Sequence, residues 1–206
     1  SLGSLGQSAA SDWDVWLCLN SDIDHAEQQL IENKCAAIEK WGNQIGAELH
    51  LFLVKENQFR DGITAGFDKE SSGSAQHWLL LDEFYRSAIR LAGKPIRWYL
   101  PQEHKSVDSL DFGYPNTVPA QEYFGAMMWQ LYKGIDSPEK SLLKALLLES
   151  YFNDYPHTQL LSVSYQELLQ SSEFTDHYYL LFQRISNHLV SLNDHKRLAL
   201  VRDCFY

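Results

Sequence analysis

Residues 12–19, DWDVWLCL, place two acids at the start of an apolar and aromatic run. The eleven residues before this run are mostly Gly, Ser and Ala, a composition typical of a loop. The run itself predicts a β-strand. Because side chains alternate along a strand, Asp12 and Asp14 share one face, while Trp13 and Val15 point to the other. A loop leading into a strand that opens with two carboxylates is therefore the first constraint on the fold.

Two carboxylates side by side repel each other unless a positive charge lies between them. A divalent cation held by oxygen ligands is the usual solution, and Mg²⁺ prefers that arrangement alongside substrate phosphates. The Gly/Ser loop offers backbone N–H groups that can approach a phosphate closely. The pattern therefore predicts a phosphoryl- or nucleotidyl-transfer site. The alternative interpretation is a solvated pair of surface acids.

The chain's composition restricts its partners. With 206 residues, 45% of them hydrophobic, it can form one large domain or two small ones. Its net charge of -10 argues against binding nucleic acid, which needs a basic surface. A small nucleotide, held by a metal and a few cations, fits better. No apolar run reaches the roughly 18 residues of a membrane span. The three Cys are odd in number and far apart in the sequence, which favours reduced buried thiols in a cytoplasmic protein, and no CxxC pair suggests zinc.

Periodicity and punctuation predict an α+β fold. A helix is expected from Ser21 or Asp22 to about Ile45. The other expected elements are strands at 47–54 and 95–100 and helices at 76–91, 120–134, 138–153, 165–171 and 176–203. These give a small mixed sheet with flanking helices, followed by an all-helical subdomain. The expected divisions are a catalytic domain at 1–100, a linker at 101–119 and the helical subdomain at 120–206. Since the chain opens without Met, we interpret it as a piece of a longer protein that lacks the N-terminal part of the catalytic domain.

The loop and acid pair resemble the nucleotidyltransferase superfamily that includes DNA polymerase beta, in which a Gly-Ser pair precedes the acids by roughly ten residues. Ser1 stands at that distance. A narrower resemblance, to the class I adenylate cyclases of gammaproteobacteria, runs along nearly the whole chain. It is carried by SLGSLGQSAASDWDVW, GSAQHWLLLDEFYRSAIRLAGKPIRW, QEYFGAMMWQLYKGIDSPEKSLLKALLLESY and the terminal LVRDCFY. That family converts ATP to 3′,5′-cyclic AMP and pyrophosphate, the reaction of a phosphorus–oxygen lyase.

The resemblance implies a metal site of two Mg²⁺ or Mn²⁺ ions on Asp12 and Asp14. Superfamily members generally add a third carboxylate from a neighbouring strand. Glu48 is the candidate here, since it would share a strand face with His50. An edge-strand acid facing water is the other interpretation of Glu48. Glu56 lies past the strand end and is a weaker candidate, and His50 is more often a plain strand residue than a base.

The resemblance also implies a set of nucleotide-binding residues. Ser1 matches a loop serine near the triphosphate, and Ser11 and Trp16 match positions tied to activity. Lys94 matches a lysine near ATP, and Asp176 matches a functional acid in the later helical part.

Lys140 and Lys144 lie four residues apart and therefore share a helix face. Related nucleotidyltransferases place lysines from the helical subdomain on the β- and γ-phosphates. A solvated helix face is the alternative, and Lys144 is the better candidate because its surroundings are more apolar.

Two other function classes stay open. Another nucleotidyltransferase could pass a nucleotide to a protein or small-molecule acceptor, and a non-catalytic domain could bind nucleotide alone. An RNA acceptor is disfavoured by the acidic charge. The family resemblance further implies regulation by a protein of the carbohydrate-uptake phosphotransferase system, through a C-terminal region that this chain does not include. The segment 101–119 is shorter than its counterpart in that family.

Overall fold

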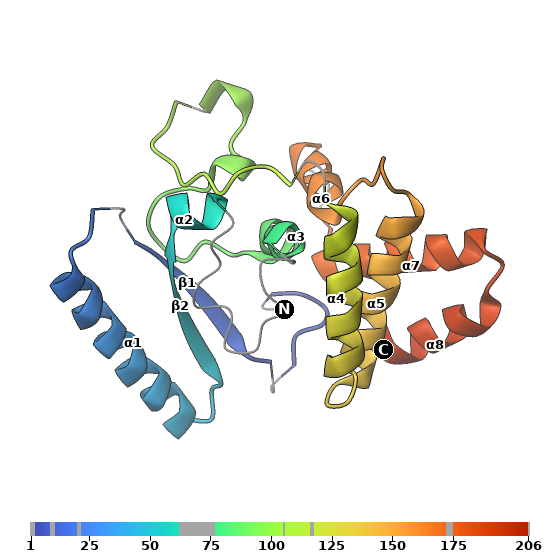
Figure 1. Cartoon of the computed structure of the whole chain (residues 1–206), viewed down its shortest axis with the longest axis horizontal. Helices are drawn as coiled ribbons and strands as arrows, with labels where there is room; N and C mark the ends of the chain where they lie inside the picture. Colours follow the sequence, from blue (N-terminus) through green and yellow to red (C-terminus); the bar gives the residue numbers. More distant parts are fainter. Residues whose placement is uncertain are drawn as a thin grey trace. The chain divides into compact units, whose positions relative to one another are not determined.

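The computed structural model describes residues 3–8, 11–19, 22–61, 77–104, 106–115, 118–171 and 175–205. They form two compact units (Figure 1). The residues of the sheet unit come from Ser1–Gly3, Gln7–Ser74 and Ile89–Tyr114. Those of the helical unit come from Ser4–Gly6, Ala75–Ala88 and Pro115–Tyr206. The predicted domain boundary at 101–119 stays a prediction. The compact units differ from it, because residues 75–88 belong to the helical unit.

The sheet unit is built on a β–α–β crossover. Strand β1 (Trp13–Leu19) and strand β2 (Leu49–Lys55) pair in parallel, joined by helix α1 (His25–Gln44). An α+β fold is confirmed, but the predicted mixed sheet is wrong for the described residues, whose sheet has two parallel strands. The nucleotidyltransferase-like character of the fold stays a proposal.

Helix α1 has a side-chain cap at its start and packs closely on the sheet near its end. Its N-cap is Asp24, whose carboxylate accepts the Glu27 N–H at 2.8 Å, so the predicted cap at Asp22 is two residues early. The other predicted cap, Ser21, lies outside the described residues. Near the C-terminus, Gly42 lies so close to β2 that a Cβ there would be 3.2 Å from that of Leu49.

The segment predicted as a third strand, 95–100, forms a 3₁₀ turn instead, η2 (Arg97–Tyr99). It makes one isolated parallel bridge, between Ile96 and Leu110. Pro95 has no N–H to donate to a ladder and Pro101 follows at once, so a strand here would lose donors at its margins. The turn buries Trp98. A second 3₁₀ turn, η3 (Gln102–His104), follows.

The hydrophobic centre of the sheet unit is aromatic. Short helix α2 (Glu56–Arg60) buries Phe59, which packs against Trp16 of β1 with ring centroids 5.2 Å apart. Phe112 meets both rings edge-on, at 6.0 Å from Trp16 and 5.6 Å from Phe59. The face of β1 that carries Trp16 is therefore covered at this point.

The helical unit contains α3 (His77–Ser87), α4 (Ala120–Lys133), α5 (Pro138–Asn153), α6 (Leu161–Gln170), α7 (His177–Ser191) and α8 (His195–Phe205). Helix α5 packs on α4, α7 and α8, and α3 packs on α6. The core includes Leu143, Leu147, Tyr151, Ile185, Leu189 and Val201. No helix among the described residues is long and apolar enough to span a membrane.

Three predicted helix boundaries in this unit are wrong. Helix α3 ends at Ser87 rather than residue 91, and α6 begins at Leu161 rather than 165. The predicted helix 176–203 is two helices, because Asn193 adopts a left-handed φ of 55° and Asp194 caps α8 by accepting the Arg197 N–H at 2.9 Å.

A buried polar network joins α3, α5 and α6. Asp82 is 2% exposed, and its carboxylate accepts the Tyr151 hydroxyl at 3.0 Å and the Ser162 N–H at 2.8 Å. The Tyr151 hydroxyl in turn accepts the Leu161 N–H at 2.8 Å. Arg86 is buried beside them, with its Nε 3.9 Å from Asp82. A buried charge needs such partners, so this network is structural.

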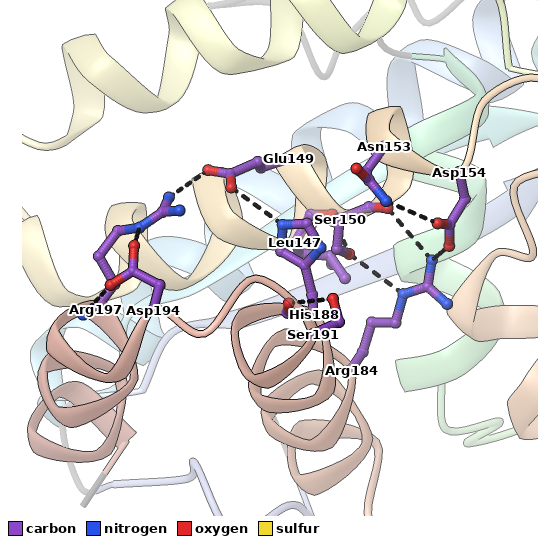
Figure 2. A network of polar contacts seen from close by, with 10 residues as sticks. All are labelled: Leu147, Glu149, Ser150, Asn153, Asp154, Arg184, His188, Ser191, Asp194 and Arg197. Carbon is purple, nitrogen blue, oxygen red and sulfur yellow. Dashed lines mark hydrogen bonds and ion pairs between the residues drawn. The ribbon is translucent and has the colours of Figure 1, made fainter.

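A second polar network ties α5 to α7 and α8 (Figure 2). Glu149 of α5 accepts from Arg197 at 2.6 Å and lies 3.0 Å from His188 Nε2. Arg184 of α7 donates to Ser150, the next residue of α5, and to Asp154, which follows the end of that helix. The two arginines thus fasten both C-terminal helices to the same central helix.

Candidate active site

The predicted acid pair lies at the start of β1. Asp12 directly precedes the strand and is partly buried. Asp14 is the second residue of the strand, lies on the same face as Asp12 and is exposed. Trp16 follows two residues later and anchors that face through Phe59 and Phe112. The predicted strand is confirmed, and with it the alternation of side chains that places the two acids on one face.

Glu48 lies next to this pair in register. Its carbonyl accepts the Trp13 N–H at 2.8 Å, and Asp14 pairs with His50, so Glu48 and His50 share the face of the two aspartates. The Glu48 side chain is 67% exposed and lies 3.5 Å from His50 Nε2. Within the described ranges no three His, Cys, Asp or Glu side chains form a metal-holding group. The third carboxylate therefore stays a prediction, and Glu56 begins α2 instead.

The loop before β1 holds its own shape. Four of its backbone N–H groups donate to side-chain oxygens at 2.6–3.2 Å: those of Gly3, Leu5, Gly6 and Ser8, to Gln7, Asp176, Ser4 and Ser11 respectively. Sequence reasoning expected such N–H groups to approach a phosphate, but these four already have acceptors. The loop is thus a folded turn, and Ser1 lies outside the described residues.

Ser11 closes this turn just ahead of the acid pair. It is buried, its Oγ accepts the Ser8 N–H at 2.9 Å, and its own N–H donates to the Ser8 carbonyl at 3.1 Å. The predicted role of Ser11 in nucleotide binding is untested, while its role in shaping the loop is visible.

The three predicted lysines lie in both units. In the sheet unit, Lys94 forms an exposed ion pair with Asp108 at 2.8 Å. In the helical unit, Lys144 of α5 lies 3.1 Å from Glu83 of α3 and lowers the pKa of that carboxyl to about 2. Lys140, one turn earlier, is exposed. Sequence spacing could not have revealed the Lys144–Glu83 pair, whose members are 61 residues apart.

Asp176 is the N-cap of α7. Its Oδ1 accepts the N–H groups of Tyr178 and Tyr179, each at 2.8 Å, and its Oδ2 accepts the Leu5 N–H at 2.9 Å. The family resemblance predicts a functional role for Asp176 but does not indicate which contacts it makes. The structure shows that it contacts the loop.

Comparison with known proteins decides the family. Residues 1–99 match the family model described as the adenylate cyclase NT domain, and residues 118–206 match the second domain of class I adenylate cyclase. The chain belongs to the class I adenylate cyclase family. The segment 100–117, which falls between the two matches, contains Pro101 and Pro115 of the predicted linker.

Curated relatives of this family align along the whole chain. Adenylate cyclases from Yersinia intermedia, Escherichia coli (strain K12) and Salmonella typhimurium are each 42% identical to it over 228 aligned positions. The alignments cover 100% of this chain and 27% of each relative, so the chain spans about a quarter of their length. No solved structure matches the chain.

Proposed function

We propose that the protein containing this class I adenylate cyclase chain converts ATP to 3′,5′-cyclic AMP and pyrophosphate. One observation carries the proposal: the chain is 42% identical, along its whole length, to proteins named adenylate cyclase. The exposure of Asp14 and the partial exposure of Asp12 support it, because a substrate can reach carboxylates that are not enclosed by packing.

The acid pair suits a divalent cation. Mg²⁺ is usually bound by one or two carboxylates together with substrate phosphates, rather than by an all-protein cage. Asp12 and Asp14 provide two carboxylates on one strand face, so a third protein ligand is not required for binding. Two Mg²⁺ or Mn²⁺ ions, when bound, would acidify the ribose 3′-hydroxyl and offset charge on the departing pyrophosphate.

The reaction is an intramolecular displacement. The 3′-oxygen forms a bond to the α-phosphorus, the bond from that phosphorus to the α,β-bridging oxygen breaks, and pyrophosphate leaves. Glu48 is the proposed acceptor of the 3′-hydroxyl proton, and its place on the strand face of the two aspartates supports this role. Since nucleophile and electrophile belong to one molecule, the protein's main task is to hold them in line.

Cations are proposed to hold the triphosphate. Lys94 is in an exposed ion pair with Asp108 and Lys144 is in a half-buried one with Glu83, so a phosphate has to displace a carboxylate from each. Ion pairs near the surface contribute only about 0–1 kcal/mol, which a triphosphate can outcompete. Lys140 would add charge from the same face of α5. Ser1, Ser11 and Trp16 complete the proposed nucleotide site.

The remaining proposals follow from charge and family. ATP is the partner, and the net charge of -10 argues against nucleic acid. A cytoplasmic location and regulation by a phosphotransferase-system protein are implied by the family resemblance alone.

The decisive experiment supplies α-labelled ATP and Mg²⁺ to the full-length protein with no acceptor present. We expect labelled cyclic AMP, which an acceptor-dependent nucleotidyltransferase cannot make. Asp12→Asn and Asp14→Asn should each lower the rate by at least about 100-fold, since metal-assisted charge stabilisation is worth several kcal/mol.

Asp61→Asn is the matched control, an exposed acid that follows α2 in the same unit, and it should leave the rate unchanged. Activity retained in either variant of the pair would refute the metal assignment. If the wild-type protein binds MgATP but forms no cyclic AMP, the non-catalytic alternative gains support.

A further inference from the structure

Asp176 performs two tasks with its two carboxylate oxygens. Oδ1 caps α7 through the N–H groups of Tyr178 and Tyr179, and Oδ2 accepts the N–H of Leu5. Leu5 precedes Asp176 by 171 residues, and both belong to the helical unit. The Gly/Ser loop is thus fastened to the first turn of α7 by a charge-assisted hydrogen bond, one of the stronger kinds.

Gly6 extends the same attachment by packing. A Cβ on Gly6 would lie 3.0 Å from three ring carbons of Tyr178, which is tighter than nearly all real Cβ contacts, so the ring would have to shift. The Tyr178 ring is itself stacked on Phe205 of α8, with centroids 4.8 Å apart. Gly6 therefore lies against a supported aromatic ring, and a larger residue at this position would push against that ring.

The attachment at Leu5 and Gly6 lies a short distance along the chain from the acid pair. Five residues separate Gly6 from Asp12, and two of them, Ser8 and Ser11, are hydrogen-bonded to each other. A loop that is already ordered needs less additional ordering when substrate binds, so its affinity for substrate is higher. Without its anchor at Leu5, the loop would gain conformational freedom that binding has to remove.

We propose that Asp176 is a positioning residue that fixes the loop ahead of the acid pair, rather than a ligand to metal or substrate. This inference rests on the proposed function, since it assigns the loop a part in binding MgATP. Both carboxylate oxygens accept backbone N–H groups, three in all, which is the coordination of a structural clamp.

Asp176→Asn separates the two tasks in the full-length enzyme. Asn caps helices about as well as Asp, so its amide oxygen keeps the two N–H groups of α7. Its NH₂ then faces the Leu5 N–H, donor against donor, and the loop is released. We expect the KM for MgATP to rise about tenfold or more, as befits the loss of a charge-assisted hydrogen bond. At saturating ATP, the Mg²⁺ dependence should not change.

Gly6→Ala disturbs the same attachment without altering the carboxylate. It should raise the KM similarly, and the double variant should be little worse than the single ones, because both break one contact. Asp194→Asn is the matched control: it caps α8 through the Arg197 N–H and should not change the KM. Amide hydrogen exchange at Leu5 gives a readout independent of activity and should accelerate in both test variants.

A shifted Mg²⁺ dependence in Asp176→Asn, with an unchanged KM in Gly6→Ala, would show a metal ligand and overturn the proposal. Leu5 exchange as slow in Asp176→Asn as in the wild type would overturn it too. If Asp176→Asn does not fold, Gly6→Ala and its exchange rate decide. Failure of the proposed function looks different, because the wild-type protein would then make no cyclic AMP.

Discussion

The two units use carboxylates in opposite ways. In the sheet unit, Asp12 is partly buried, Asp14 is exposed and Glu48 is 67% exposed, all at the start of paired strands. In the helical unit, Asp82 is 2% exposed and accepts hydrogen bonds from Tyr151 and Ser162. Burial without partners would be very costly for Asp82, so its partners are part of the fold. The packing of the sheet unit makes no such demand on its exposed acids, which are therefore better candidates than Asp82 for contact with a substrate.

The largest effect expected from this contrast is on stability. Asp82→Ala leaves Arg86 buried without its counter-charge and removes the acceptor for Tyr151 and Ser162. Breaking a buried pair in this way costs about 3–5 kcal/mol of unfolding free energy. Asp12→Ala should change it by no more than about 0.5 kcal/mol. Urea unfolding of both variants measures the difference, and equal losses would contradict the contrast between the units.

Local patterns were enough to predict most elements. The apolar runs of β1 and β2 and the helical periodicity of α1, α4 and α5 are properties of neighbouring residues. The predicted strand at 95–100 is wrong because the prolines at its margins limit the pairing to a single bridge, and a 3₁₀ turn follows it. The break at Asn193 was missed because a left-handed non-glycine residue carries little sequence signal.

The site was predictable to a lesser extent. Alternation placed Asp12 and Asp14 on one face from the sequence alone, and the register of β1 and β2 then put Glu48 on that face. The partners of Lys144 and Asp176 lie 61 and 171 residues away along the chain. Only the tertiary fold brings such groups together, and no spacing rule anticipates them.

The helical unit holds a second buried carboxylate, Glu122, whose pKa lies near neutrality. Burial raises the pKa of Glu122 on α4 to about 7 from an ordinary 4.5, against the opposing effect of the Trp78 N–H it accepts. Between these values the folded protein binds more protons than the unfolded chain, so stability is fully present below pH 4.5 and falls as pH rises through 7. The loss is on the order of 3 kcal/mol.

Glu122→Gln mimics the protonated form and should remove this part of the pH dependence. Unfolding free energies at pH 5 and pH 8 measure the slope. Glu139→Gln, at an exposed position of α5, is the control that should keep it. A slope that survives in the Glu122 variant would assign the pH dependence to another group.

The smallest effect expected is at Lys144, whose charge both pairs with Glu83 and is proposed to bind the triphosphate. Its ion pair with Glu83 is between side chains 43% and 44% exposed, so its loss should change stability by about 0–1 kcal/mol. Lys144→Ala should nevertheless raise the KM for MgATP about three- to tenfold if the lysine reaches the triphosphate, as a lost contact to a charged group of about 1 kcal/mol would. Steady-state kinetics of the full-length enzyme measures this.

Glu83→Gln distinguishes a binding lysine from a structural one. It removes the carboxylate that phosphate has to displace, so it should lower the KM while Lys144→Ala raises it. If the pair is only structural, both variants lose the same small stability and neither alters the KM. Lys140→Ala tests the helix face that Lys140 shares with Lys144. A change in KM like that of Lys144→Ala would mean that the whole face attracts the substrate. An unchanged KM would mean that, of the two lysines, only Lys144 binds it.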